Sequence, residues 1–162
     1  MVGYDVAQIC ERGHVVNSMS LQFSESNEEY CSKCGARTIT ACPSCDKPIR
    51  GSHVVNTEDE FGYEPMRLTP SYCRGCGEPY PWTRAGLDAA KEMVAELAGL
   101  DADEKKLLQT SIDDIASDTP RTDLAASRIK RLLAKVGKEA AETLREIVIR
   151  LAVDTAKGKL QS

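Results

Sequence analysis

Six of the seven cysteines stand in Cys-x-x-Cys pairs, and this spacing restricts the possible folds more than any other feature of the sequence. The pairs are Cys31 with Cys34, Cys42 with Cys45, and Cys73 with Cys76. The remaining cysteine, Cys10, is followed four residues later by His14. A two-residue gap allows one tight turn to direct both sulfurs at a single ion, and four such ligands complete a tetrahedral zinc site. The eight ligands therefore predict two structural Zn²⁺ ions.

These eight ligands can be assigned to two ions in two ways. A near-repeat, Tyr30–Gly35 and Tyr72–Gly77, favours sequential zinc ribbons, in which each repeat is the second half of one site. One site then consists of Cys10, His14, Cys31 and Cys34, and the other of Cys42, Cys45, Cys73 and Cys76. The alternative is a cross-brace that joins alternate pairs, as in the RING domains of ubiquitin ligases. RING domains usually separate their middle pairs by about two or three residues, whereas seven residues lie between Cys34 and Cys42.

The expected location of the chain also favours metal over disulfide bonds. No apolar stretch approaches the ~20 residues that span a bilayer. Residues 1–5 lack the basic segment and apolar core of a signal peptide. We therefore expect a cytoplasmic protein without membrane contact, and cysteines in a reducing compartment are more often metal ligands than disulfides.

The composition changes sharply near residue 82 of the 162. All eight aromatic residues, all seven cysteines and both histidines precede residue 83, and the chain after it is rich in Ala, Leu, Lys and Glu. The first 82 residues contain few long aliphatic side chains, so a fold there needs metal to stabilise it. The sequence predicts a small zinc-stabilised β domain of tandem zinc ribbons at 1–82, followed by an all-α helical bundle at 83–162.

Four segments of the second domain have apolar residues at helical spacing: 84–98, 102–117, 120–136 and 138–157. Thr83 is expected to cap the first helix, and Asp101 with Glu104 resembles a capping box for the second. Thr119–Pro120 predicts the start of the third. Gly137 either separates the last two helices or kinks one longer helix, so we expect three to four helices.

The charge balance argues against a nucleic-acid-binding protein. Lys and Arg number 21 and Asp and Glu 25, for a formal net charge of −4. Seven thiolates and two Zn²⁺ ions would change it to −7, whereas binding to a phosphate backbone depends on a positive surface. The best candidate surface is 121–138, where six basic residues and one acidic residue give a net charge of +5. The preceding segment, 101–118, has a net charge of −4, so neighbouring helices could instead neutralise each other.

A catalytic role is disfavoured by the number of ligands. A zinc enzyme keeps one coordination position open, whereas four protein ligands for each ion describe closed, structural sites. The histidine left over, His53, lies near the acidic run Glu58–Glu60 and could serve as a general base. Such a histidine is more often a structural or an exposed strand residue. We therefore expect no catalytic residues.

Several motifs of the first domain resemble one known family. They are Tyr4–Cys10 with Gly13 and His14, Tyr30–Gly35, Cys42–Cys45, Pro48–Gly51 and Tyr72–Thr83. Together these motifs resemble domain-of-unknown-function family 2321, an uncharacterised bacterial family, over residues 4–83. The resemblance implies a cytosolic bacterial protein with zinc-ribbon knuckles, and it implies no particular activity.

These observations favour a zinc-binding adaptor or interaction module whose partner is another protein. The alternative is a zinc-ribbon nucleic-acid-binding protein that uses 121–138. A contact site is expected in the long segment 51–70, where Phe61 and Tyr63 either contact the partner or pack into the domain's own small core. The wide apolar face of 138–157 either joins two copies of the chain or lies buried at the centre of the bundle.

Overall fold

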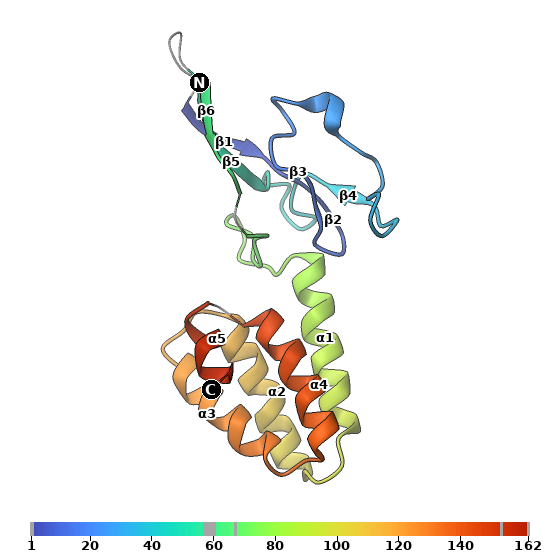
Figure 1. The fold of residues 1–162 in the computed structure, drawn as a ribbon, viewed down its shortest axis with the longest axis vertical. Coiled ribbons are helices and arrows are strands. Elements are labelled where there is room, and N and C mark those ends of the chain that lie inside the picture. The colour runs from blue at the N-terminus through green and yellow to red at the C-terminus, as the bar shows by residue number, and fades with distance from the viewer. Residues whose placement is uncertain (1, 57–60, 67, 153, 162) are drawn as a thin grey trace. The chain divides into compact units, whose positions relative to one another are not determined.

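The computed structural model describes residues 2–56, 61–66, 68–152 and 154–161. Contacts divide the chain into two compact units, which we call the β unit (residues 1–84) and the helical unit (residues 85–162). The chain has the predicted order of small β sheets followed by an all-α region (Figure 1). The boundary between the units falls inside the first long helix, α1 (Pro81–Glu96). It stays a prediction that residues 1–82 and 83–162 are separate folding domains.

Two small antiparallel sheets make up the β unit. The first has the order β3-β2-β4 and consists of β2 (Gln8–Cys10), β3 (Val15–Asn17) and β4 (Thr38–Ile39). All three residues of the central strand β2 are buried. The return from β2 to β3 takes only residues 11–14, which brings His14 back beside Cys10. A short 3₁₀ helix, Ser24–Ser26, lies in the longer connection from β3 to β4.

The second sheet, of order β1-β5-β6, joins segments that are far apart in the sequence. β1 (Val2–Val6) pairs with β5 (Arg50–Asn56), which pairs with β6 (Phe61–Glu64). Much of the segment 51–70, which we expected to be a loop, is therefore a β hairpin. That this segment contacts a partner stays a prediction. A lone hairpin is marginally stable, and the strand that completes the sheet comes from the other end of the unit. The acidic run 58–60 lies outside the described residues.

The hydrophobic core of the β unit is small and includes two of the cysteines. Its buried members are Ala7, Ile9, Cys42, Ile49, Cys73 and Tyr80. Trp82 packs against this core and stacks on Tyr80, with the two ring centroids 4.8 Å apart. The Trp82 Nε1–H also donates a hydrogen bond to the Pro70 carbonyl at 2.8 Å. So few aliphatic side chains are typical of small folds that depend on bound metal.

Five helices follow in the described chain, and α2 and α4 begin where the sequence predicts. The helices after α1 are α2 (Ala102–Ala116), α3 (Thr122–Leu133), α4 (Lys138–Leu151) and α5 (Asp154–Gln161). The predicted capping box of α2 is confirmed. The Asp101 side chain accepts a hydrogen bond from the Glu104 N–H, and the Glu104 side chain accepts one from the Asp101 N–H. Over the described residues, no helix combines the length and apolarity needed to cross a bilayer.

The starts of α1 and α3 differ from prediction. α1 begins at Pro81, and Thr83 is buried within its first turn instead of capping it. Proline is favoured at a first helical position, where its missing N–H would have had no partner. α3 begins at Thr122 and not at residue 120. The Thr122 hydroxyl accepts a hydrogen bond from the Thr119 N–H, which holds the intervening residues in a separate turn.

The predicted helix 138–157 is broken at Ala152, where ψ is 144° and the backbone is extended. The break raises the number of helices above the expected three to four. The apolar pattern continues across it because both helices contribute to one core, through Leu144, Val148, Ala152, Ala156 and Leu160. Ile149 also packs against this core, while Val153 lies outside the described residues.

Candidate metal centres

The three Cys-x-x-Cys turns, which we call knuckles, share one backbone hydrogen-bond scheme. The N–H of each first cysteine donates to the carbonyl five residues later, at 2.8–2.9 Å: Cys31 to Ala36, Cys42 to Lys47, Cys73 to Glu78. The carbonyl of each first cysteine accepts from the N–H four residues later, at 2.7–2.9 Å, and the donors are Gly35, Asp46 and Gly77. Because the N–H groups are used in this way, each turn closes tightly around its two sulfurs.

In every knuckle, the residue that directly follows the second cysteine has a left-handed backbone. Its φ is +71° at Gly35, +57° at Asp46 and +76° at Gly77. Glycine adopts this conformation freely, and aspartate is one of the few other residues that tolerate it. The sequence shows a repeat of two knuckles because both have glycine there. The structure shows three such knuckles. The Cys42–Cys45 knuckle is hidden in the sequence because Asp46 stands where the other two have glycine.

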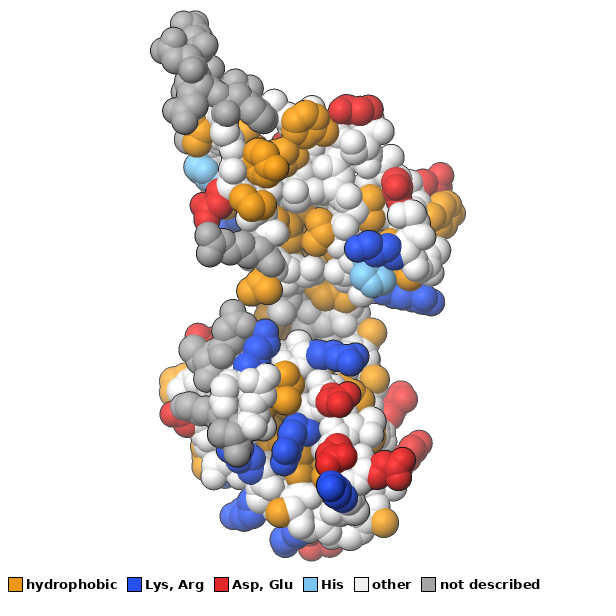
Figure 2. All heavy atoms as spheres, viewed as in Figure 1, with side chains coloured by type: hydrophobic (Ala, Val, Ile, Leu, Met, Phe, Trp, Pro, Cys, Tyr) orange, Lys and Arg blue, Asp and Glu red, His pale blue; other side chains and the backbone are white. Residues whose placement is uncertain are grey.

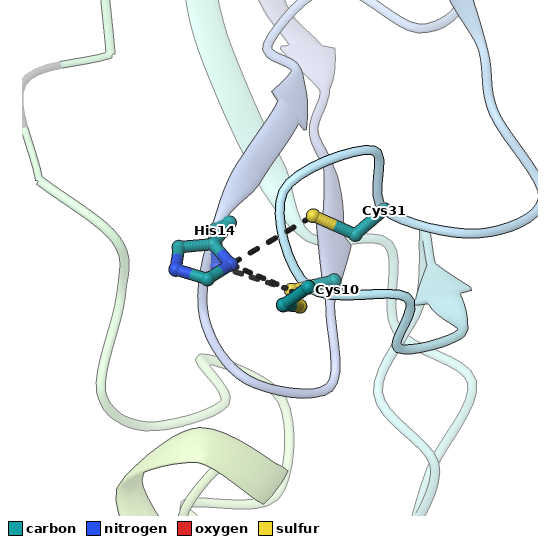
Figure 3. Close-up of side chains that lie close together, drawn as sticks. Cys10, His14 and Cys31 are labelled. Carbon is teal, nitrogen blue, oxygen red and sulfur yellow. Dashed lines mark hydrogen bonds between the residues drawn. The ribbon is translucent and has the colours of Figure 1, made fainter.

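Cluster 1 consists of Cys10, His14, Cys31 and Cys34, whose ligand atoms all lie within 4.8 Å of one another. His14 directs Nδ1 at two sulfurs, 3.6 Å from Cys10 Sγ and 3.7 Å from Cys31 Sγ (Figure 3). The Cys34 sulfur lies 3.7 Å from that of Cys10. Cys10 and His14 come from the β2–β3 turn, which also donates the His14 N–H to Cys10 Sγ at 3.3 Å. One strand turn and one knuckle therefore build this cluster.

Cluster 2 consists of Cys42, Cys45, Cys73 and Cys76, again with all four ligand atoms within 4.8 Å of one another. Two knuckles face each other, with sulfur–sulfur distances of 3.8 Å from Cys42 to Cys76 and 3.6 Å from Cys45 to Cys73. Cys42 and Cys73 are buried, whereas Cys45 and Cys76 are exposed. Both clusters have the composition of the sequential arrangement and not that of the RING-like cross-brace.

The sulfurs of cluster 2 perturb one another's ionisation. Hydrogen bonds from the N–H groups of Cys76 and Gly75 lower the pKa of Cys73 to about 6. The Lys47 N–H favours the thiolate of Cys45, but the neighbouring Cys76 sulfur and burial outweigh it and raise the pKa of Cys45 to about 12. One thiol of the group thus ionises readily, whereas a neighbouring thiol resists ionisation.

Cluster 1 shows the same contrast. Burial opposes ionisation of Cys31, but hydrogen bonds from the Lys33 N–H and the His14 ring outweigh it and lower the pKa of Cys31 to about 7. Burial raises the pKa of Cys10. A divalent cation at the centre of each group would allow all of its thiols to be thiolates at neutral pH, and binding it would release protons. Four soft ligands at mutual distances of a few ångströms fit such an ion.

His53, the candidate general base, lies on the central strand β5 between Tyr4 of β1 and Glu64 of β6. Its ring meets the Tyr4 ring edge-on, with the centroids 5.0 Å apart. The Arg50 guanidinium lies 4.2 Å from the centre of the same Tyr4 ring. These contacts are those of a half-buried strand residue that packs on its neighbours, the structural role that the sequence favours for this histidine.

Of the two aromatic residues in the predicted contact segment, Tyr63 is 55% exposed and does not belong to the core. Tyr63 lies opposite Val54, which lies opposite Gly3, so one row crosses all three strands. Val54, Gly3 and the 71% exposed Leu21 line a hollow of about 180 Å³. Leu21 has no distinguishing pattern in the sequence, and it lies within the turn residues 18–23. The side chain of Phe61 lies outside what the structure describes.

Ion pairs within the helical unit engage three of the six basic residues of 121–138. Arg121 pairs with Asp114 at 3.0 Å, Lys135 with Glu104, and Lys138 with Glu142 at 3.9 Å. Two of the three acidic partners lie in the segment 101–118, as expected if neighbouring helices neutralise each other.

Comparison with curated proteins and with solved structures gives no match. A family model matches residues 3–160, which includes the helical unit as well as the cysteine motifs at 4–83. The family assignment that those motifs predict is therefore confirmed over nearly the whole chain. The chain belongs to the bacterial family described as "Uncharacterized protein conserved in bacteria (DUF2321)".

Proposed function

We propose that this protein is a non-catalytic zinc module that binds another protein, with one Zn²⁺ ion in each cluster. The convergence of eight ligand residues into two groups of four is the observation that carries this proposal. The ions are structural, because each group supplies a complete tetrahedral set from the chain itself. Thiolate and imidazole ligands in this arrangement favour zinc among the metals available in cells. Seven free cysteines suit a reducing compartment such as the bacterial cytoplasm.

The distribution of exposed apolar side chains supports a protein partner for the β unit. Eight large apolar side chains are exposed among the described residues, and seven of them lie in this unit: Tyr4, Val15, Leu21, Phe23, Tyr30, Tyr63 and Leu68. Apolar side chains are prominent on the face of the β unit that Figure 2 shows. Exposed apolar side chains are enriched at interaction sites, and aromatic ones are efficient anchors. The proposed contact surface consists of the exposed Leu21 and Tyr63 together with the hollow that Gly3 and the buried Val54 line.

Nucleic acid is a weaker alternative. Three of the six basic side chains of 121–138 are ion-paired with nearby carboxylates. On the face of the helical unit that Figure 2 shows, basic and acidic side chains are interspersed. A phosphate backbone is bound by a continuous positive surface, so we expect at most weak, salt-sensitive binding.

Self-association through 138–157 is a further proposal. Leu144 and Val148 are fully buried in the unit's own core, and Ile149 packs against it. These contacts favour the alternative of a central helix. Light scattering at high protein concentration separates the two, since a strictly monomeric protein contradicts the dimer.

Two measurements test the main proposal. Native mass spectrometry of protein purified without chelator should give two zinc ions per chain, and one or none would contradict it. Affinity purification from a bacterial host should then recover a protein with the wild-type chain but not with Leu21→Glu. Leu124→Glu is the matched control, because Leu124 is the exposed leucine of the helical unit (45%). If both variants lose the recovered protein equally, the proposed surface is contradicted. Sub-micromolar, sequence-selective binding of nucleic acid at physiological salt would contradict it as well.

A further inference from the structure

The two clusters differ in the access of solvent to their sulfurs. In cluster 1 the thiols of Cys10 and Cys31 are buried and that of Cys34 is partly covered. The Arg12 guanidinium donates a hydrogen bond to the Cys34 carbonyl at 3.3 Å. In cluster 2 both Cys45 and Cys76 are exposed. Two cysteines of cluster 2 are therefore open to an electrophile in solution, whereas no cysteine of cluster 1 is exposed.

The absence of a side chain at Gly75 contributes to this access. A Cβ added at Gly75 would lie 3.3 Å from the Cys45 sulfur and about as close to the side chain of Lys47. The corresponding positions of the other two knuckles are Lys33 and Ser44, which both have side chains. Glycine at this position therefore adds no side-chain atom beside the Cys45 sulfur.

The charge of the ligand set acts in the same direction. Three thiolates and a neutral imidazole around a divalent ion leave a charge of −1, whereas four thiolates leave −2. The additional negative charge resides on the sulfurs, and exposed, electron-rich thiolates are the ones that react with soft electrophiles. The two sites thus differ in both accessibility and nucleophilicity, and both differences favour reaction at cluster 2.

We propose that cluster 2 is a site of oxidative modification by hydroperoxides, at which the exposed Cys45 and Cys76 react and cross-knuckle disulfides replace the metal ion. This inference rests on the proposed zinc binding. The two proposed disulfides join sulfurs that are in contact, since Cys45 lies 3.6 Å from Cys73 and Cys76 lies 3.8 Å from Cys42. Each pair joins an exposed sulfur to a buried one in the opposite knuckle, so the bond that forms keeps the two knuckles together.

The chemistry of the first pair balances with one hydroperoxide molecule. The Cys45 thiolate attacks the peroxide oxygen, an S–O bond forms, the O–O bond breaks and hydroxide (or alkoxide) leaves. The Cys73 thiolate then attacks the sulfenic sulfur, the S–S bond forms, the S–O bond breaks and hydroxide leaves. The two cysteines lose two electrons, the peroxide gains them, and both leaving anions take protons from water. With two of its four ligands oxidised, cluster 2 no longer holds an ion.

The test uses the full-length, zinc-loaded protein and hydrogen peroxide. Zinc is counted by native mass spectrometry over time, and oxidised cysteines are located by alkylation and peptide mapping. We expect one of the two ions to be lost at least about tenfold faster than the other, with disulfides at Cys45–Cys73 and Cys42–Cys76. Cysteines 10, 31 and 34 should remain reduced at that stage. Faster or equal oxidation of cluster 1 would overturn the inference, whereas fewer than two ions before peroxide is added would overturn the proposed function itself.

A variant that retains every ligand tests the role of access. Gly75→Ala places a methyl group against the Cys45 sulfur and should slow loss of the first ion by about threefold or more. Gly62→Ala is the control, because an added Cβ there meets no atom within 4 Å. An unchanged rate in Gly75→Ala would contradict the role of the exposed Cys45. If Gly75→Ala binds fewer than two ions, the mapping of the wild-type protein still decides the order of oxidation.

Discussion

Gly77 ends the third knuckle with a φ of +76°, and an added Cβ would meet no atom within 4 Å. Any cost of Gly77→Ala therefore comes from the backbone conformation and not from a clash. A left-handed conformation costs a non-glycine residue roughly 1–2 kcal/mol. We expect Gly77→Ala to lower the stability of the β unit by about that amount, measured by denaturant unfolding of the zinc-loaded protein through the fluorescence of Trp82, the single tryptophan.

Gly137→Ala is the matched control for this change. Gly137 also has free space around an added Cβ, but its φ is −58°. The fluorescence transition should not move in this variant, and equal shifts in the two variants would contradict the backbone explanation.

Asp46 occupies the same position in the second knuckle and is the one described non-glycine residue with a positive φ. The ligands themselves can be predicted from the sequence because their spacing is local to each turn. That the second knuckle belongs to the same repeat is less evident, because Asp46 replaces the glycine that marks the other two. Which sulfurs are exposed cannot be read from spacing, since it depends on what packs around each cluster.

At the level of elements, β5 approaches the turn after β3 so closely that it requires glycine. A Cβ added at Gly51 would lie 2.2 Å from the Ser18 carbonyl oxygen and 3.0 Å from the Ala7 nitrogen. The next residue, Ser52, donates its N–H to the same Ser18 carbonyl at 2.9 Å, which fixes the two backbones together. We expect Gly51→Ala to destabilise the β unit by about 3 kcal/mol or to prevent its folding, as measured by thermal unfolding of the zinc-loaded protein.

The neighbouring strand supplies the control for this prediction. Gly62→Ala adds a methyl group on β6 with no atom within 4 Å, and its effect should stay within about 1 kcal/mol. A small effect at Gly51 would show that β5 can move away from the turn without loss of the fold.

Glu104 joins two elements of the helical unit, since it closes the capping box of α2 and pairs with Lys135. Hydrogen bonds from Lys135 and from the Asp101 N–H hold the pKa of Glu104 below its ordinary value of 4.5. A lowered pKa in the folded state contributes stability above the unfolded pKa, and this contribution is lost as the pH falls through the folded pKa. Glu104→Gln should therefore lower the helical melting temperature at pH 7 and reduce its decline on acidification below about pH 4.5.

Glutamine retains the geometry of the capping box, so this variant isolates the charge. Glu142→Gln is the control, because the pair of Glu142 with Lys138 is exposed, 3.9 Å apart and of the kind that contributes little. Melting followed by far-ultraviolet circular dichroism at several pH values should distinguish the two variants. Identical pH dependence in wild-type and Glu104→Gln would contradict the assignment.

Some elements can be predicted from sequence patterns alone, and others cannot. The capping box of α2 is local and is predicted correctly from two residues, Asp101 and Glu104. The break at Ala152 is not predicted, because residues on both sides of it pack on one core and preserve the apolar periodicity. The hairpin at 50–64 is missed for the opposite reason, since its third strand is β1, about fifty residues earlier in the chain.

At the scale of the whole molecule, we predict which of the two units depends on bound metal for its folding. The β unit has a small core that includes Cys42 and Cys73, so loss of its ions should unfold it. The helical unit has its own continuous core and no predicted ligand. We expect a chelator, or Cys42→Ser, to shift the emission of Trp82 to the red while most of the helical circular dichroism remains. Simultaneous loss of both signals would show that the chain folds as one cooperative domain.

The hydrogen-bond scheme of the knuckles has a consequence for how such a protein can change over time. The scheme uses backbone groups together with one left-handed residue, and isolated bridges close the three turns at Tyr30–Arg37, Ala41–Pro48 and Tyr72–Pro79. The two residues between the cysteines take no side-chain part in it and are Ser-Lys, Pro-Ser and Arg-Gly. Each knuckle therefore has a fixed length and a backbone hydrogen-bond scheme in which these side chains take no part. The side chains at these positions can therefore change in charge without altering the hydrogen-bond scheme, and Gly75 is the exception in size, because an added Cβ there would lie 3.3 Å from the Cys45 sulfur.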